Sequence, residues 1–483
     1  MAIFLPDEIW RQIFSHFEMA LHNGDGNLKS VKNLAALSLV SRRFHHIAQS
    51  LLHRTIQLWR LHNLFFGAGH ELYLRLAKAI ANNPQLGLLT REISLAHGAP
   101  TAHVTLSIDD NLMDLLRNRI ELLNISSEFI DLLKRDIIFG QQGSGVASFL
   151  LALMPRVRLV ELWFYDEIPL ALPYLLGGRL SQNTGEPHTV ANHLHNLQEL
   201  RIVAAHRQTC AYNDCFGSIF LHPNLRTLKL SRFDWSEETI TDMEWPDYPC
   251  NLRQLNLNRC IVDASTIRNV LSCCTKLQNF IITADSYDTY SDPRYRDWKV
   301  DLNEFGDVLR ELGQNLVKFE FGTPAYERVR LATGKVGSLQ SLKALTHLSI
   351  ARNDFIGAED DFVRPKDDLS AIPLAEALPT SIEVMDFKED TPHARMIQGV
   401  YWYGKMHDEI YSLAVGGQFP SLREIKLLRR GIPEDHRFER EVPGWDVEDT
   451  NRSVSSVLVY EDYTKMTLCM KRRDGGSERV QNV

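Results

Sequence analysis

The sequence lacks the features of a secreted, a membrane-spanning or a nucleic-acid-binding protein. Its 7 cysteines, an odd number scattered over 483 residues, do not make a disulfide framework. No uninterrupted apolar run reaches the roughly 18 residues of a membrane-spanning helix. The net charge of −8 is the opposite of the basic footprint that nucleic acids require. The first residues have no basic stretch before an apolar one, so they do not resemble a signal peptide. We therefore expect a cytoplasmic or nuclear protein with reduced thiols.

The motifs of common enzyme classes are also missing. Gly334-Lys335 is followed by Val336 and has no upstream glycine, so it is not a phosphate-binding loop, and no H-E-x-x-H, G-x-S-x-G or kinase motif set occurs. One cluster has donors that suit zinc, but its spacing matches no zinc finger, and the alternative is a loop with unpaired thiols; it consists of His206, Cys210, Cys215 and His222. We expect no catalytic residue, no cofactor and no metal site.

What the sequence does contain first is a helical, apolar-rich segment near the N-terminus. Pro6 suits the first position of a helix, and Asp7 and Glu8 place negative charge in its first turn. Two more helices are expected to follow it. The apolar residues of the three are Ile9, Trp10, Ile13, Phe14, Phe17 and Leu21; Leu34, Leu37 and Leu39; and Phe44, Ile47, Leu51 and Leu52. Three short helices cannot bury this much apolar surface among themselves, so the segment predicts a partner protein.

These residues resemble the F-box. Its pattern is L-P-x-E-I-x-x-x-I-F, then L-x-L-V-S-R-R-F-x-x-I-A, then L-x-R-x-I. It is met by Leu5, Pro6, Glu8, Ile9, Ile13 and Phe14, by Leu37 and Leu39 to Phe44, by Ile47 and Ala48, and by Leu52, Arg54 and Ile56. The link at residues 18–32 is longer than usual in the family, and the alternative reading is an ordinary amphipathic helical hairpin. The resemblance implies binding of the Skp adaptor of SCF-type cullin–RING ubiquitin ligases. The implied adaptor-binding residues are Leu5, Pro6, Ile9, Ile13, Leu37, Val40 and Arg43.

The remainder of the chain repeats the unit L-x-x-L-x-L, with other apolar residues allowed at the second and third sites. Successive units begin 25 to 40 residues apart, and the shorter spacings match the period of a leucine-rich repeat. The alternative is a set of scattered strands in an unrelated α/β domain. The units begin at Leu159, Leu197, Leu225, Leu252, Leu277, Leu316, Leu345, Ile382 and Leu422, and a weaker copy begins at Leu89.

Each unit predicts a short strand and a return segment, and the units must stack because none can close a core alone. The predicted fold class is α/β: a small all-α F-box module, then a leucine-rich-repeat-like solenoid with parallel strands on its concave face and helices on its convex face. The predicted domains are 1–58 (F-box), 59–154 (helical linker and N-terminal cap of the solenoid), 155–471 (irregular leucine-rich-repeat solenoid) and 472–483 (disordered tail). Helices are expected at 72–82, 112–139, 146–153, 264–274, 302–312, 369–378 and 401–415, and a closing hairpin at 454–460 and 465–471.

A target protein is expected to bind the outward-facing strand positions or the long insertions. The candidates on strands are Trp163, Tyr165, Arg201, Lys229, Asn256 and Asn258. Those in the insertions at 234–249 and 285–301 are Trp235, Tyr287 and Tyr290. Exposed aromatic residues are typical binding anchors. The alternatives are that the N-terminal cap covers the first aromatic pair and that the insertions pack on neighbouring turns.

The predicted function is substrate recognition within an SCF-type cullin–RING ubiquitin ligase. The F-box would dock the Skp adaptor, and the repeat arc would bind an unknown protein substrate, with no catalysis by this chain and no contact with nucleic acid or membrane. The scarcity of arginines on the predicted concave face disfavours a phosphate-binding pocket. One alternative is a non-catalytic interaction scaffold that binds the adaptor without delivering a ubiquitination substrate. Another is a hydrolase or transferase in the central region.

Overall fold

The computed structural model divides the chain into two compact units. Unit 1 comprises residues 1–233 and 242–252, and unit 2 comprises residues 234–241 and 253–483. The structure describes residues 5–17, 27–58, 69–97, 110–122, 127–139, 144–164, 172, 175, 194–204, 219–220, 222–236, 245–246, 249–284, 299–322, 332–357, 372–388, 399–430, 438, 440–454 and 463–473. The tail expected to be disordered lies outside these ranges from residue 474 onward.

Unit 1 begins with a three-helix domain made of α1 (Asp7–Ser15), α2 (Asn27–Ser38) and α3 (Arg42–Leu52). Ser41 starts α3, because its hydroxyl accepts a hydrogen bond from the Phe44 amide at 3.1 Å. Phe44 then packs its ring against Trp10 at 4.7 Å and against Phe14 at 5.1 Å. The buried core of the domain consists of Phe14, Leu34, Ile47, Ala48 and Leu51.

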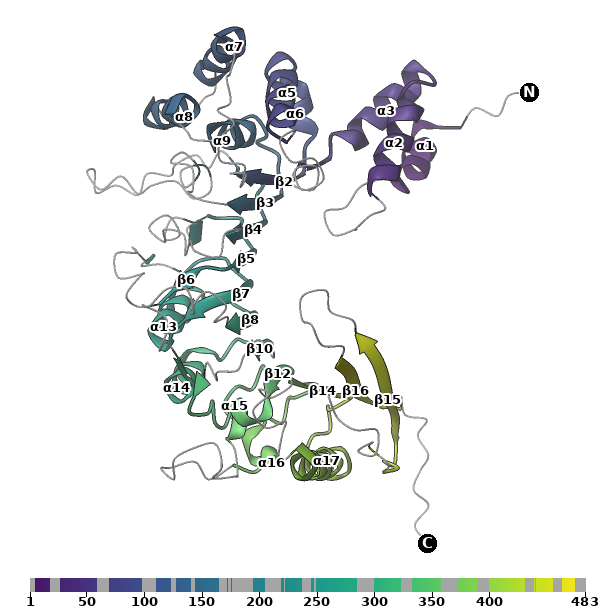
Figure 1. Ribbon diagram of the computed structural model, residues 1–483, viewed down its shortest axis with the longest axis vertical. Helices are drawn as coiled ribbons and strands as arrows, with labels where there is room; N and C mark the ends of the chain where they lie inside the picture. Colours follow the sequence, from purple (N-terminus) through teal and green to yellow (C-terminus); the bar gives the residue numbers. More distant parts are fainter. Residues whose placement is uncertain are drawn as a thin grey trace. The chain divides into compact units, whose positions relative to one another are not determined.

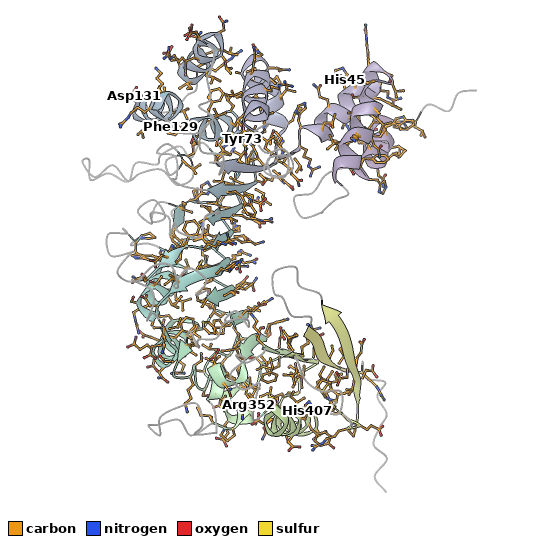
Figure 2. The ribbon with its side chains drawn as sticks, viewed as in Figure 1. His45, Tyr73, Phe129, Asp131, Arg352 and His407 are labelled. Atoms are coloured by element: carbon orange, nitrogen blue, oxygen red, sulfur yellow. The ribbon has the colours of Figure 1, made fainter. Side chains whose placement is uncertain are left out.

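Further helices follow in unit 1: α5 (Gly69–Asn82), α6 (Pro84–Leu89), α7 (Asp110–Glu121), α8 (Ser127–Phe139) and α9 (Ser144–Ala152). The described side chains of α9 are all buried, since this helix is apolar all round and packs against α5, α8 and β2. Tyr73 of α5 and Phe129 of α8 are also buried (Figure 2). The single helix predicted over residues 112–139 is wrong, because α7 ends at Glu121 and α8 begins at Ser127.

The strands of unit 1 are β1 (Thr55–Gln57), β2 (Glu92–His97), β3 (Leu159–Phe164), β4 (Glu199–Ala204) and β5 (Thr227–Ser231). Each pairs in parallel with the next, so that equivalent repeat positions are neighbours, as in Ile93↔Val160 and Val160↔Leu200. Figure 1 shows β2 to β5 stacked in this order. The strand predicted from the weak copy at Leu89 is therefore confirmed as β2, whereas β1 was not predicted.

Unit 2 continues the same pattern. Its parallel strands are β7 (Gln254–Val262), β8 (Asn279–Ala284), β10 (Lys318–Gly322), β12 (His347–Ala351), β13 (Val384–Lys388) and β14 (Glu424–Arg430). Two short pairs accompany them, β6 (Asp234–Trp235) with β7, and β9 (Val300–Asp301) with β11 (Ala332–Thr333). The predicted fold class is confirmed: a helical N-terminal region precedes an α/β array of parallel repeat strands.

Asparagines placed just before a strand join successive repeats. In unit 1 the Nδ2 atoms of Asn224 and Asn251 donate to His195 O at 2.6 Å and to Pro223 O at 2.9 Å. In unit 2 Asn315 Nδ2 donates to Thr275 O at 2.8 Å. Each of these asparagines precedes the first leucine of its repeat, so the side chain satisfies a carbonyl one repeat earlier. We refer to these residues as the asparagine ladder.

Helices cover one side of the unit 2 strands: α13 (Ala264–Cys273), α14 (Leu302–Leu312), α15 (Arg352–Ile356), α16 (Leu374–Ala377) and α17 (Gly399–Val415). Phe305 of α14 packs on Phe319 and Phe321 of β10, with ring centroids 5.9 and 5.7 Å apart. α17 is held by Arg352, whose guanidinium makes a bidentate ion pair with Glu409 at 2.6 and 2.7 Å (Figure 2). Of the helix predicted at 369–378, the part described from residue 372 onward forms only α16, and residues 369–371 lie outside the described ranges.

Unit 2 ends in an antiparallel hairpin of β15 (Trp445–Val454) and β16 (Tyr463–Arg472), with β16 paired to β14. The second strand of the predicted hairpin is confirmed. Its first strand was placed too late in the sequence, since β15 ends at Val454, where it was expected to begin. Among the described helices, none combines the length and the apolar character needed to cross a bilayer.

Candidate functional site

The three-helix domain exposes apolar side chains that no described part of the chain covers. Six large apolar residues are exposed among the described residues, and four of them belong to this domain. Leu39 and Val40 are 85% and 66% exposed, and Ile9 and Ile13 are 40% and 39% exposed. We call these four residues the exposed apolar cluster. Because so many of the exposed large apolar residues lie in one small domain, this domain is the candidate for contact with another protein.

The sequence explains why these side chains point outward. On α1, Ile9 and Ile13 are four residues apart and share one side of the helix, while Phe14 lies in the core. Leu39 and Val40 form the turn between α2 and α3, in which the Val40 amide donates to Leu37 O at 3.2 Å. This turn ends at the Ser41 cap, which leaves both side chains outside the core.

The other predicted adaptor-binding residues occupy more sheltered positions. Arg43 forms an ion pair with Asp7, and its Nη2 donates to Leu5 O at 2.6 Å, so Arg43 fastens the start of α1 to α3. Leu37 is partly buried against the domain core. Leu5 is half-buried and Pro6 is exposed. Contact between any of these residues and an adaptor stays a prediction.

The repeat strands of unit 1 present a polar face that is largely neutralised. Glu199 Oε1 accepts from Arg201 at 2.7 Å and from Lys229 at 2.9 Å. Burial opposes the ionisation of Glu199, but the hydrogen bonds and charges of Arg201 and Lys229 outweigh it and lower the pKa of this carboxyl below its usual value. Glu161 Oε2 similarly accepts from Ser94 at 2.7 Å. These contacts occupy Ser94, Glu161, Glu199, Arg201 and Lys229 on this face.

Two predicted substrate-binding residues are not surface residues. Trp235 was expected in an exposed loop, but it lies on β6 and its side chain is fully buried. The chain bends at Arg232, which has a φ of 65°, and the segment after it pairs in parallel with β7. Arg201 was expected on an exposed face but is only 9% exposed, because it packs beside Glu199.

The remaining substrate-binding candidates are placed as follows. Trp163 and Asn256 are half-buried, Lys229 is half-buried in its ion pair, and Asn258 is exposed. Tyr165, Tyr287 and Tyr290 lie outside the described residues. The structure therefore brings Trp163 and Lys229 onto the unit 1 strands, and Asn256 and Asn258 onto β7.

The polar face of unit 2 contains both paired charges and uncharged residues. Glu320 accepts from Lys318 at 2.6 Å and lies 3.6 Å from the Lys388 ammonium. Glu424 lies 3.1 Å from Lys426. The outward positions 254, 256 and 258 of β7 and 279, 281 and 283 of β8 are uncharged, and Arg259 is the charged residue of β7. The outward positions thus change from paired ions on β10 and β14 to neutral groups on β7 and β8.

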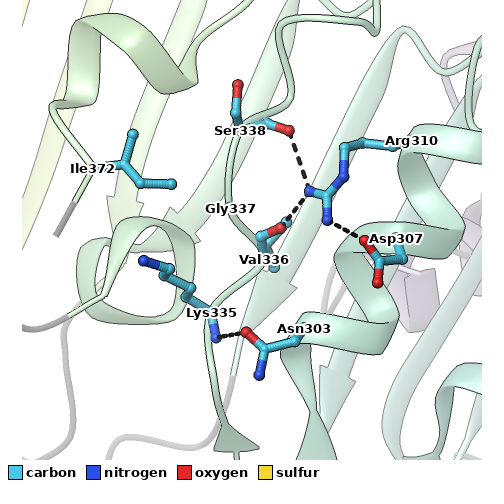
Figure 3. A pocket seen from close by; sticks show the side chains of 8 residues that line it. All are labelled: Asn303, Asp307, Arg310, Lys335, Val336, Gly337, Ser338 and Ile372. Atoms are coloured by element: carbon cyan, nitrogen blue, oxygen red, sulfur yellow. Dashed lines mark hydrogen bonds and ion pairs between the residues drawn. The ribbon is translucent and has the colours of Figure 1, made fainter. Parts of the chain in front are cut away.

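A pocket of about 250 Å³ lies between α14 and residues 335–338 (Figure 3). Arg310 donates to Val336 O at 2.7 Å, to Ser338 O at 3.2 Å and to Asp307 at 2.6 Å. Gly306 permits the close approach of this segment, since a Cβ there would lie 1.9 Å from Val336 O. These polar groups are bonded to one another, which is the arrangement of a structural brace.

His222, one member of the zinc-like cluster, is buried and serves the fold. Its Nε2 donates to Leu194 O at 3.1 Å, and its Nδ1 accepts from the Asn224 amide at 3.3 Å. Burial lowers the pKa of His222 to about 4. The other three members, His206, Cys210 and Cys215, lie outside the described residues.

Comparisons with protein families agree with this two-part architecture. Residues 3–60 match the family described as F-box-like. Residues 190–296 match the family described as FBD-associated F-box protein At5g56370, LRR repeats. The chain is organised as an F-box protein with leucine-rich repeats. A search of curated proteins finds no match to it. The three-helix domain is accordingly the F-box-like domain, and strands β4 to β8 lie within the stretch that matches the leucine-rich repeat family.

Sequence reasoning missed two features of these surfaces. Leu39 was counted among the apolar residues of the second helix, yet it is the most exposed of the four residues in the exposed apolar cluster. The repeating Asn-Leu dipeptide ahead of several strands is a visible signal of the asparagine ladder. The exposure of Leu39 has no comparable signal. The spacing of apolar residues shows which of them share a helix face, but not whether another part of the fold packs on that face.

Proposed function

We propose that this chain is the substrate-recognition subunit of an SCF-type cullin–RING ubiquitin ligase. In this role the F-box-like domain docks a Skp-family adaptor, and the leucine-rich repeats hold a target protein. The chain itself is non-catalytic, and ubiquitin transfer is carried out by the recruited assembly in the cytoplasm or nucleus. The match of residues 3–60 to the F-box-like family supports this proposal.

The observation that carries the proposal is the exposed apolar cluster of the F-box-like domain. Its four members are exposed, whereas described residues such as Phe14, Trp10 and Phe44 pack in the core of the same domain or against it. Burying such side chains in a partner is favourable by roughly 25 cal/mol for each Å² of apolar surface removed from water. An apolar adaptor groove would supply that burial.

Adaptor capture by purified full-length variants tests the proposal. We expect Ile9→Asp combined with Val40→Asp to lower the affinity for a Skp adaptor by at least about thirtyfold, as loss of interface anchors does. Leu122→Asp is the matched control, because Leu122 is 73% exposed but lies at the end of α7, outside the F-box-like domain. Equal capture by the double variant and the control would refute adaptor docking by this surface.

A second measurement separates a ligase receptor from a scaffold that only binds the adaptor. Proteins that co-purify with the wild-type chain should include a cullin, and at least one captured target should accumulate in cells when Ile9 and Val40 are replaced. If the adaptor is retained while no target changes in abundance, the scaffold function is favoured instead.

A further inference from the structure

Two neighbouring strands of unit 2 carry a polar face unlike that of the strands beside them. The outward positions of β7 and β8 pair in register as Gln254↔Asn279, Asn256↔Ile281 and Asn258↔Thr283. Asn258 is exposed and the other five residues are half-buried. Four of the six side chains are carboxamides, so we call these six residues the carboxamide patch.

Three of the four carboxamides of the patch are not used by the fold in the way other asparagines are. Within the described part of the chain, the side chains of Gln254, Asn256 and Asn279 make no hydrogen bond. Asn251 and Asn315, by contrast, donate to backbone carbonyls of the asparagine ladder. A carboxamide carries two donors and an acceptor, so the patch offers paired donors and acceptors to a ligand.

The charge of the surroundings indicates what kind of ligand fits. None of the six patch residues is ionisable, and on the adjacent strand β10 Lys318 and Glu320 pair with each other at 2.6 Å. The charged residues next to the patch are Arg253, which precedes β7 and is exposed, and Arg259 on β7. Within the patch itself a strongly charged ligand would find no opposite charge. A complementary ligand is therefore uncharged and rich in both donors and acceptors, which describes the main chain of a polypeptide.

The spacing of the patch also matches an extended polypeptide. Side chains on one face of a strand are separated by about 6.6 Å, which is the repeat of two residues in any extended chain. A segment lying along β7 would place equivalent peptide groups over Gln254, Asn256 and Asn258. Ile281, beside Asn256 in the register, adds an apolar contact at the middle of the patch.

We propose that the carboxamide patch binds an extended, uncharged segment of a target protein, mainly through that segment's main chain, with one apolar side chain over Ile281. This inference rests on the proposed function, because it names the class of target that the repeats hold. The patch lies within residues 190–296, the part of the chain that matches the leucine-rich repeat family.

Selection from a phage-displayed library of random linear peptides tests the proposal, with the full-length chain as bait. The affinity of the selected peptides is then measured for the variant Gln254→Ala/Asn256→Ala/Asn279→Ala. We expect a loss of about three- to tenfold for each carboxamide, and at least about thirtyfold for the three together. The control Gln278→Ala/Gln340→Ala/Gln418→Ala removes three exposed carboxamides outside the strands and should change affinity by less than about twofold.

Main-chain recognition requires its own readout. Replacing one peptide N–H by an ester oxygen should weaken binding to the wild type about three- to tenfold, because a donor is lost. The same replacement should have little effect on binding to the triple variant, whose partner groups are already absent. Failure to select any peptide, selection of only highly charged peptides, or equal affinity of the wild type and the triple variant would each overturn the proposal.

Adaptor capture by the same preparations keeps the two proposals apart. The triple variant should retain the Skp adaptor and the far-UV circular dichroism spectrum of the wild type, since the patch is remote in sequence from residues 3–60 and its side chains are partly exposed. If the wild type binds peptides but not the adaptor, the proposed ligase function fails while the carboxamide patch stands.

Discussion

The F-box-like domain and the leucine-rich repeats treat apolar side chains in opposite ways. The F-box-like domain buries Phe14 and its neighbours but leaves Leu39 and Val40 on the surface. The repeat strands bury every second residue, as in Thr227–Ser231, where Leu228 and Leu230 face inward. Their polar faces are occupied by internal ion pairs or by carboxamides. Under the proposed function, the F-box-like domain would bind through apolar burial and the repeats through polar recognition.

The largest expected effect comes from a substitution in the buried core of the F-box-like domain. Replacing Phe14 with alanine should destabilise this domain by about 3–5 kcal/mol, because a buried ring in contact with Trp10 and Phe44 is lost. Ile13→Ala, on the same helix but exposed, should cost less than about 0.5 kcal/mol. Hydrogen exchange measured by mass spectrometry would show reduced protection in α1 to α3 for Phe14→Ala alone. An equal loss of hydrogen-exchange protection in the two variants would mean that the Phe14 ring contributes no more to the stability of this domain than the exposed Ile13 side chain does.

The next largest effect is the pH dependence of the free energy of unfolding of the unit 1 repeats. His222 is neutral in the fold because burial disfavours its charged form; its Nδ1 accepts from the Asn224 amide while Nε2 donates to Leu194 O. Its pKa is lowered from 6.5 to about 4, so the unfolded chain takes up the proton first as the pH falls. The folded state is therefore favoured above pH 6.5 and loses up to about 3 kcal/mol as the pH falls towards 4.

Urea unfolding of the wild type and of His222→Gln between pH 7.5 and 4 measures this effect. The variant should be less stable near neutral pH, and the two curves should converge as the pH falls, since the wild type then loses the advantage of its neutral imidazole. Parallel curves over the whole range would show that His222 contributes no proton linkage. Glu199 adds a loss at still lower pH, because its pKa is below its usual 4.5 in the folded state.

The repeat strands were predictable because their signal is both local and periodic. The apolar positions of each L-x-x-L-x-L unit predict which side chains point into the core, and Leu200 and Ile202 are buried accordingly. α13 and α14 were predicted to within one residue at each end, since each has an apolar face of helical period. The three residues of β1 lie at the end of the F-box pattern, which includes Ile56, and carry no repeat signal, so the sequence alone did not separate them from the F-box-like domain.

The candidate sites were less predictable, because exposure depends on neighbours distant in sequence. Trp235 lies in a segment rich in acidic residues and aromatics, which favoured a loop, yet pairing with β7 buries it. Arg201 occupies an outward strand position, but Glu199 two residues earlier on the same strand and Lys229 on the next strand enclose it in a charge network. Strand periodicity predicts the side of the sheet on which a residue lies, but not the ion pairs formed there.

The smallest expected effect is a difference in stability between variants of two asparagines. The side chain of one is hydrogen-bonded within the fold, and that of the other is not. Asn251 donates to Pro223 O at 2.9 Å in the asparagine ladder, whereas Asn256 lies in the carboxamide patch and bonds to no described residue. Asn251→Ala should lower the free energy of unfolding by about 1 kcal/mol, the net value of one hydrogen bond. Asn256→Ala should change it by less than about 0.5 kcal/mol while it weakens binding of the selected peptides. Chemical denaturation and peptide titration of both variants decide the matter: if Asn256→Ala is the more destabilising of the two, its carboxamide serves the fold, and the contrast between ladder and patch is lost.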